Sequence, residues 1–306
     1  MSATIPGEPG LLAAEGIREI TKGLAKDITI TDYATGLPAD NWSTFADGAW
    51  DLLGVPEEAG GAGLDLRDLV EVATAWGERV LPLPLMPTIV AKRWSAAARE
   101  SGGPVSYALA EAGVILAPFA AFPDVRLLTA TDAEPADAGG APRQALTAVP
   151  ADTAVENFAP TLGKGTVPAA TELASAARHE LAVLVAAEAA GTARALLTGA
   201  SGYAKTREQF GRPIGSFQAI KHHLANAYIS VELAVTAVSW AVQEPGAYSV
   251  PVNTALQEAQ RAAELATQVY GGNGFTWEMG IHFFLRHLLS LRSSADALLA
   301  DSSVSR

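Results

Sequence analysis

Two short segments of this chain carry the side chains that bind phosphates and flat rings. The first, Arg207–Gln218, begins Arg-Glu-Gln-Phe-Gly-Arg-Pro-Ile and ends in Phe-Gln. Gly211 and Pro213 interrupt a helical pattern, which predicts a tight corner. A guanidinium such as that of Arg207 binds phosphate oxygens in a bidentate way, and Phe210 can stack on a flat ring. The corner can therefore hold a diphosphate, or it can be a helical hairpin with an arginine salt bridge and a buried phenylalanine.

The second segment, Gln268–Phe275, reads Gln-Val-Tyr-Gly-Gly-Asn-Gly-Phe and has three glycines in four residues. Backbone N–H groups in such a corner can form an anion-binding nest beside a helix N-terminus. The same residues can equally be a plain helix-to-helix turn with a left-handed cap. No strand precedes the segment, so it is not a dinucleotide-binding fingerprint.

Long helical patterns must position both corners. Apolar periodicity predicts helices over residues 173–209, 217–242, 252–270 and 277–299. Four long helices joined by short loops form an antiparallel bundle. We therefore assign residues 170–306 to a C-terminal four-helix bundle.

Residues 1–101 also read as helical. Leu11, Ile17 and Leu24 belong to one helical stripe, and a second helical pattern with core aromatic residues covers 41–53. Residues 54–64 are rich in glycine, which predicts a sharply turning loop. Asp65 or Asp68 is then the candidate cap of a helix that stops before Pro82.

Residues 102–169 change character. Runs of strand length occur at 105–108, 114–116 and 125–129, and the stretch Ala133–Arg143 reads as a loop. The sequence thus predicts a mainly α fold with a small β segment. Its parts are an N-terminal helical domain (1–101), a reduced middle β domain (102–169) and the bundle.

Composition excludes several classes of function. The formal net charge of −12 argues against a nucleic-acid partner, and the absence of cysteine excludes disulfides, thiolate catalysis and cysteine-based zinc sites. The five histidines lack ligand spacing, so no metal site is expected. The N-terminal residues lack a basic and an apolar region, and no uninterrupted apolar run reaches ~18 residues. These features predict a cytoplasmic protein without a signal peptide or a membrane span.

The segments "YAKTREQFGRPIGSFQAIKHHLAN" and "QVYGGNGFTWE" together resemble the C-terminal signature of the acyl-CoA dehydrogenase family. The segment "WDLLGVPEEAGGAGLDLRDLVEVATAWGERV" resembles the opening helical domain of that family. The resemblance covers most of the chain in the order of the family's domains. It implies a helical–β–helical subunit that assembles as a dimer of dimers and binds FAD between subunits.

The resemblance also implies roles for six residues. Arg207 would contact the FAD diphosphate, with Gln209 and Phe210 along the adenosine end. Gln218 would hydrogen-bond the same half of the cofactor. Gln268 and Gly272 would line the adenosine side from the second corner.

The family's catalytic glutamate has no clear counterpart. Ala295 falls at its usual position, and Asp296 is one residue later. Some members place this base on the first C-terminal helix, where Leu181 falls here. Glu180 is one residue away, and one residue corresponds to a rotation of about 100° around the helix. If Glu180 is not the base, we expect it on a solvated helix face. The middle domain also lacks the Trp/Tyr-Ile-Thr stretch that contacts the isoalloxazine in the family.

These departures make the chain similar to the glutamate-lacking subunit of actinobacterial α2β2 acyl-CoA dehydrogenases, some of which act on steroid side-chain CoA thioesters. That resemblance implies FAD as cofactor, a second dehydrogenase-like subunit that supplies the glutamate, an acyl-CoA substrate and an electron acceptor. Two alternatives stay open. The chain can be a complete homomeric dehydrogenase that uses Glu180 or Asp296, or a non-redox structural or acyl-binding homologue.

Overall fold

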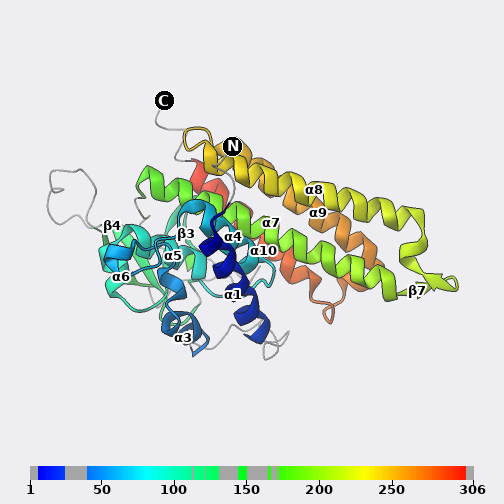
Figure 1. The fold of residues 1–306 in the computed structure, drawn as a ribbon, viewed down its shortest axis with the longest axis horizontal. Coiled ribbons are helices and arrows are strands. Elements are labelled where there is room, and N and C mark those ends of the chain that lie inside the picture. The colour runs from blue at the N-terminus through cyan, green and yellow to red at the C-terminus, as the bar shows by residue number, and fades with distance from the viewer. Residues whose placement is uncertain are drawn as a thin grey trace. The chain divides into compact units, whose positions relative to one another are not determined.

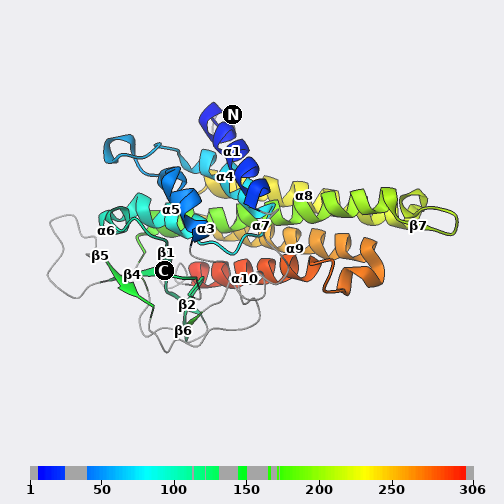
Figure 2. The same ribbon diagram turned by 90° about the horizontal axis from the view of Figure 1, so that it is seen from below.

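The computed structural model describes residues 6–24, 40–111, 114–120, 122–130, 144–149, 165–166, 171 and 173–300. Figures 1 and 2 show its ribbon in two views. The predicted loop Ala133–Arg143 and the first five residues lie outside these ranges. The chain divides into two compact units. We call Met1–Ile30, Val70–Leu81 and Val183–Arg292 the bundle unit, and Thr31–Leu69, Pro82–Ala182 and Ser293–Arg306 the mixed unit.

The bundle unit contains the four predicted C-terminal helices, in part or in whole. They are α7 (Ser175–Thr206), α8 (Gln218–Gln243), α9 (Ser249–Tyr270) and α10 (Ile281–Ala300). Both views show them running alongside one another (Figures 1 and 2). Their bounds agree with the predicted ones to within a few residues. α10 starts later than predicted because a turn through Gly280, with φ 64°, precedes it.

Two glycines let α4 (Leu66–Gly77) approach α7 closely. A Cβ on Gly191 would overlap the backbone carbonyl of Thr74, and a Cβ on Gly77 would overlap that of Glu188. The hydroxyl of Thr192 donates to the carbonyls of Gly77 (3.0 Å) and Glu188 (2.9 Å). α1 (Glu8–Leu24) joins this unit through Arg18, which pairs with Glu78 at 3.2 Å.

The mixed unit holds the described strands of the middle segment. One sheet has the order β1 (Val105–Tyr107), β4 (Arg126–Ala130), β5 (Gln144–Ala148), with β1 parallel and β5 antiparallel to β4. A second sheet has the order β2 (Leu109–Glu111), β3 (Val114–Ala117), β6 (Gly165–Thr166). The three predicted strands are thus confirmed. A small core of Ala108, Ala117 and Leu127 lies between them.

The helices of the mixed unit organise the glycine-rich loop. α5 (Leu85–Trp94) is followed by α6 (Ala96–Glu100), and α5 carries Arg93, whose guanidinium donates to the carbonyls of Gly54 (3.0 Å) and Leu64 (2.5 Å). Between these two anchors the loop turns through Gly60 and Gly63, both with positive φ, and contains the short helix η3 (Glu57–Ala59). Asp65 caps the next helix, because its carboxylate accepts from the Arg67 and Asp68 amides.

One prediction about the helices was wrong. Residues 41–53 do not form one helix, because Ala49 adopts φ 54° and separates α3 (Asp40–Asp47) from the short helix η2 (Trp50–Leu52). By length and composition alone, α7 and α8 are each long and apolar enough to cross a membrane, a test that core helices also pass. The prediction of no membrane span counted only uninterrupted apolar runs, whereas these helices tolerate one or two charges. α7 is 78% buried over its apolar window, but α8 only 39%.

Candidate functional site

The first corner is a two-strand hairpin that follows the end of α7. Glu208 and Gln209 (β7) pair with Pro213 and Arg212 (β8). The two loop residues, Phe210 and Gly211, have φ values of 53° and 76°. A two-residue hairpin loop with positive φ at both positions favours Asn or Gly at the first, so a phenylalanine there is strained. The ring of Phe210 is 92% exposed, so the alternative of a hairpin with a buried phenylalanine is wrong.

Aromatic and cationic groups support this exposed ring. Phe217 lies edge-on to Phe210, with ring centroids 6.1 Å apart. The guanidinium carbon of Arg212 lies 4.2 Å from the Phe217 centroid. These contacts hold the hairpin tip over the start of α8.

The second corner begins where α9 ends. Gly271 has φ 58°, and the short helix η6 (Gly271–Phe275) follows. The glycines of the second corner therefore lie in a short 3-10 helix, and α10 begins only at Ile281. Its Asn273 side-chain amide donates to the Tyr203 hydroxyl at 3.0 Å, and the Tyr203 and Tyr270 rings lie 4.8 Å apart. These contacts tie the second corner to α7.

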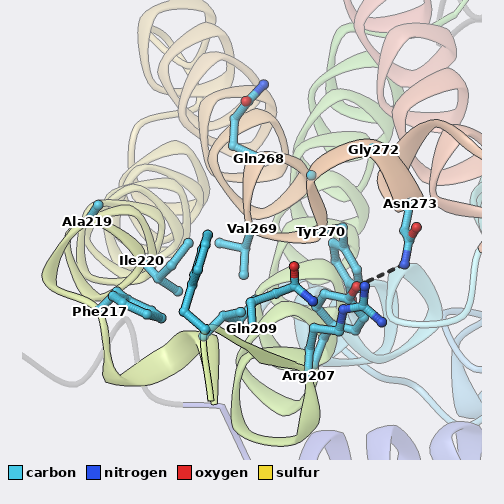
Figure 3. A pocket seen from close by; sticks show the side chains of 14 residues that line it. Arg207, Gln209, Phe217, Ala219, Ile220, Gln268, Val269, Tyr270, Gly272 and Asn273 are labelled. Atoms are coloured by element: carbon cyan, nitrogen blue, oxygen red, sulfur yellow. Dashed lines mark hydrogen bonds between the residues drawn. The ribbon is translucent and has the colours of Figure 1, made fainter. Parts of the chain in front are cut away.

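The two corners enclose an open cavity of about 510 Å³. Figure 3 shows Arg207, Gln209 and Asn273 on one side and Phe217 and Ile220 on the other. Its lining comes from the end of α7, the hairpin, the start of α8 and the α9–η6 corner. Five of the six predicted cofactor residues line it: Arg207, Gln209, Phe210, Gln268 and Gly272.

Gln218 is the exception. Its side chain is exposed, and the cavity is lined instead by its neighbours Phe217 and Ala219. Sequence reasoning missed Tyr203, Tyr270 and Asn273, which also line the cavity. Tyr203 could have been predicted from the sequence, because it precedes Arg207 by four residues in a helical pattern and therefore lies on the same helix face.

The donor set suits a phosphorylated ligand with a flat ring. The Arg207 guanidinium is exposed, and among the described residues it makes no ion pair, so its donors are available to phosphate oxygens. Gln209 and Gln268 add amide donors and acceptors, and Gln268 extends away from Arg207 at the α9 rim (Figure 3). Burial, followed by the nearby Tyr203, raises the pKa of Tyr270, which keeps its phenol neutral at pH 7. No side chain approaches the position of a Cβ on Gly272, so a ligand can reach the backbone there.

Glu180 occupies a different environment from the predicted one. It is buried in the mixed unit, where Oε2 pairs with Arg93 Nε and accepts from Trp94 Nε1, both at 3.2 Å. Burial raises the pKa of Glu180, while Arg93 and Trp94 act in the opposite direction. The expectation of a solvated helix face is therefore wrong, because this part of α7 packs on α5. Oε1 is buried and makes no hydrogen bond.

The other candidate carboxylates are also accounted for. Asp296 is exposed on α10, and the preceding Ala295 is fully buried. A further buried carboxylate on α7, Glu188, has its Oε1 2.9 Å from Nε2 of the buried His287 in the bundle unit. Neither Glu180 nor Asp296 is among the residues that line the cavity. Within the described ranges there is no group of three metal-ligating side chains.

Comparison with known proteins identifies the family. The model of the acyl-CoA dehydrogenase C-terminal domain matches residues 172–294. The acyl-CoA dehydrogenase IpdE2 of Mycobacterium tuberculosis (strain ATCC 25618 / H37Rv) is 33% identical over 243 residues, which cover 76% of this chain and 74% of IpdE2. Members of this family are oxidoreductases and FAD-binding flavoproteins.

Two solved structures are similar over nearly the whole chain. One is the ChsE4-ChsE5 complex from Mycobacterium tuberculosis, with a TM-score of 0.72, 19% identity, and coverage of 98% of this chain and 96% of that one. The other is a Tcur3481-Tcur3483 steroid acyl-CoA dehydrogenase variant, with a TM-score of 0.65, 25% identity, and coverage of 96% and 100%. These matches confirm the predicted mainly α fold with a small β segment. On the strength of the IpdE2 alignment and the domain match, this chain belongs to the acyl-CoA dehydrogenase family.

Proposed function

We propose that this chain is the FAD-sharing subunit of a heteromeric acyl-CoA dehydrogenase, which introduces an α,β double bond into an acyl-CoA. One observation carries the proposal. Five residues chosen from two distant corners of the sequence line a single open cavity. By the family resemblance, Ala295 and Leu181 would stand where a relative keeps its base. On this proposal the chain would hold part of a cofactor and would lack the carboxylate that starts the reaction.

The chain's own residues would hold one half of the cofactor. Arg207 would bind the diphosphate through its guanidinium fork. Gln209 and Gln268 would hydrogen-bond the adenosine end, and Phe210 would pack against it. FAD, when bound, supplies the acceptor for the β-hydride of the acyl chain. The cavity is open to solvent. A second subunit would close it and provide the pocket for the reactive ring.

The partner would supply the proton acceptor. Abstraction of an α-proton requires a carboxylate within hydrogen-bond reach of the carbon acid. Glu180 is held by Arg93 and Trp94, and Asp296 is exposed on the surface of α10. We therefore assign the catalytic glutamate to the second subunit and regard this chain as inactive by itself.

The relatives support a proposal for the substrate and the partner. One similar structure is named the ChsE4-ChsE5 complex, and another is named a Tcur3481-Tcur3483 steroid acyl-CoA dehydrogenase variant. On that basis we propose an α2β2 complex in the cytoplasm that acts on a steroid side-chain CoA thioester and passes electrons to an acceptor protein.

The test is the visible absorption of the chain alone and of the chain co-expressed with a longer, glutamate-bearing dehydrogenase homologue. We expect flavin only in the complex, bleached on addition of acyl-CoA. Flavin that is bound and reduced in the lone chain would instead indicate a homomeric enzyme. Absence of flavin from both samples would indicate a non-redox homologue.

Arg207→Ala in the complex tests the role of the cavity. We expect flavin occupancy to fall at least tenfold, because the diphosphate loses a bidentate, charge-assisted partner. Lys205→Ala is the matched control, since Lys205 is an exposed cation two residues earlier that does not line this cavity. Unchanged flavin occupancy in Arg207→Ala would contradict the proposal that Arg207 binds the diphosphate.

One observation favours the homomeric alternative. Glu180 is buried with a raised pKa and an unpartnered Oε1, and such carboxylates often act as bases. Reduction of the lone flavin-loaded chain by acyl-CoA, abolished by Glu180→Gln, would support this second function.

A further inference from the structure

Another cavity lies where the end of α4 meets the middle of α7. It has a volume of about 250 Å³ and is lined by Glu78, Arg79, Arg194, Ala195 and Thr198. None of these residues lines the cavity between the two corners. All of them belong to the bundle unit, and both ribbon views show α4 beside α7 (Figures 1 and 2).

Direct backbone contact fixes the position of this cavity. Gly77, the last residue of α4, packs on the backbone of Glu188, and its carbonyl accepts from the Thr192 hydroxyl at 3.0 Å. Glu78 and Arg79 follow Gly77 at once, so they lie beside the next turn of α7. The two walls of the cavity are therefore held together by the α4–α7 crossing itself.

The backbone next to Arg79 is strained. Val80 has φ 50°, in the left-handed region, which strongly disfavours a β-branched residue. The turn buries the Val80 side chain at 4% exposure and leaves Arg79 on the cavity wall. Strained backbone of this kind is concentrated at binding sites, where it holds a functional side chain in place.

The cavity wall carries an excess of positive charge. The Glu78 carboxylate is paired with Arg18, whose Nε lies 3.2 Å from Oε2. Arg194 makes no ion pair among the described residues, and Arg79 is the second guanidinium on the wall. Three arginines and one glutamate sum to +2, in a chain whose formal net charge is −12. Two guanidinium groups around so small a cavity repel each other, and a bound anion removes this repulsion.

We propose that this cavity binds a phosphate group between the guanidinium groups of Arg79 and Arg194. A guanidinium binds phosphate oxygens through two parallel N–H donors. The local charge of +2 matches a phosphate monoester, which carries about −1.5 to −2 at pH 7. A carboxylate would leave one positive charge unbalanced. The small side chain of Ala195 leaves room for the phosphate oxygens.

Two sources can supply this group. One is free inorganic phosphate, and the other is the 3′-phosphate monoester of coenzyme A, which the proposed function brings to the chain. The chemistry of recognition is the same for both. The site itself therefore stands independently of the flavin proposal.

Titration with inorganic phosphate tests the site. Calorimetry at constant ionic strength, on the full chain carrying Arg207→Ala so that the other cavity does not contribute, should show one binding site. Adding Arg194→Ala should weaken this binding at least tenfold, because one of two charge-assisted partners is lost. Adding Arg261→Ala instead should leave it unchanged, since Arg261 is an exposed arginine on α9 that pairs with Glu258.

Two further variants separate lost binding from lost structure. Arg79→Ala replaces an exposed side chain and should also weaken binding at least tenfold. Arg194→Lys keeps the charge but not the planar fork, so we expect an affinity between those of the parent chain and Arg194→Ala. Urea unfolding of each variant, with and without phosphate, shows that the chain is folded and whether phosphate stabilises it.

Coenzyme A and 3′-dephospho-coenzyme A distinguish the two sources. Tighter binding of coenzyme A, lost in Arg194→Ala, would identify its phosphate monoester as the ligand. Equal binding of the two, with inorganic phosphate still bound, would assign the site to free phosphate.

Three results would overturn the proposal. They are an absence of phosphate binding, binding that is unchanged in both Arg194→Ala and Arg79→Ala, and binding of acetate as tight as that of phosphate. No flavin is measured in these titrations, so the phosphate site and the proposed function fail separately.

Discussion

At the scale of single residues, Phe210 is the clearest mark of function. Its backbone occupies the left-handed region, which disfavours a bulky side chain, and its ring is almost fully exposed. Both features cost stability in the isolated chain. Strain of this kind persists at sites where it serves binding. A ring held out by Phe217 and Arg212 is positioned for a ligand or a neighbouring subunit.

Phe210→Asn should separate these effects. Asparagine tolerates a left-handed backbone, so we expect the free energy of unfolding to rise by roughly 0.5–1 kcal/mol. Flavin occupancy of the complex should fall, because the packing ring is lost. Urea unfolding and flavin absorbance measure the two quantities. Phe275→Asn is the control, since Phe275 is exposed without positive φ; unchanged occupancy in Phe210→Asn would contradict the assignment.

Glu180 predicts a pH dependence of stability. Its folded-state pKa is raised above the ordinary value of 4.5, chiefly by burial. Its contribution to stability is therefore fully present below about pH 4.5 and is lost as pH rises through the folded pKa. Glu180→Gln removes this titration, so its stability relative to wild type should increase with pH over that window. Chemical unfolding at several pH values measures this trend, with exposed Glu232→Gln as the control; a difference that is flat in pH would refute it.

At the scale of elements, the crossing of α4 and α7 depends on backbone-to-backbone contact. Gly191 faces the Thr74 carbonyl so closely that a methyl group does not fit. Helix propensity alone would favour alanine at this position by up to ~1 kcal/mol. Packing therefore overrides propensity here.

Gly191→Ala should lower the free energy of unfolding by about 1–3 kcal/mol, because the helices must separate to admit the methyl group. Gly202→Ala on the same helix is the matched control. No atom lies near its Cβ position, so it should stabilise the chain by about 0.5–1 kcal/mol. Thermal or urea unfolding compares the two, and equal effects would show that the α4–α7 contact is looser than the structure indicates.

At the scale of the whole molecule, the distribution of apolar surface is as informative as the cavity. α7 and α8 have similar composition, yet α7 is mostly buried and α8 mostly is not. The net charge of −12 opposes non-specific association of such chains. The open cavity and the half-exposed α8 both fit the proposed role as one subunit of a heteromeric complex.

The sequence by itself determined the long helices, the three middle strands, the two corners and five of the cavity residues. Helical periodicity and the breaks at glycine and proline are local signals, so the helices and corners can be predicted from the sequence. The five cavity residues were predicted from the resemblance to the family motif, which covers both corners. Only the tertiary structure decided that Glu180 is buried against Arg93, that Tyr203 and Asn273 join the corners, and that Phe210 is displayed. Those outcomes depend on which helix packs against which face, and contacts between residues far apart in the sequence leave no periodic trace in the chain.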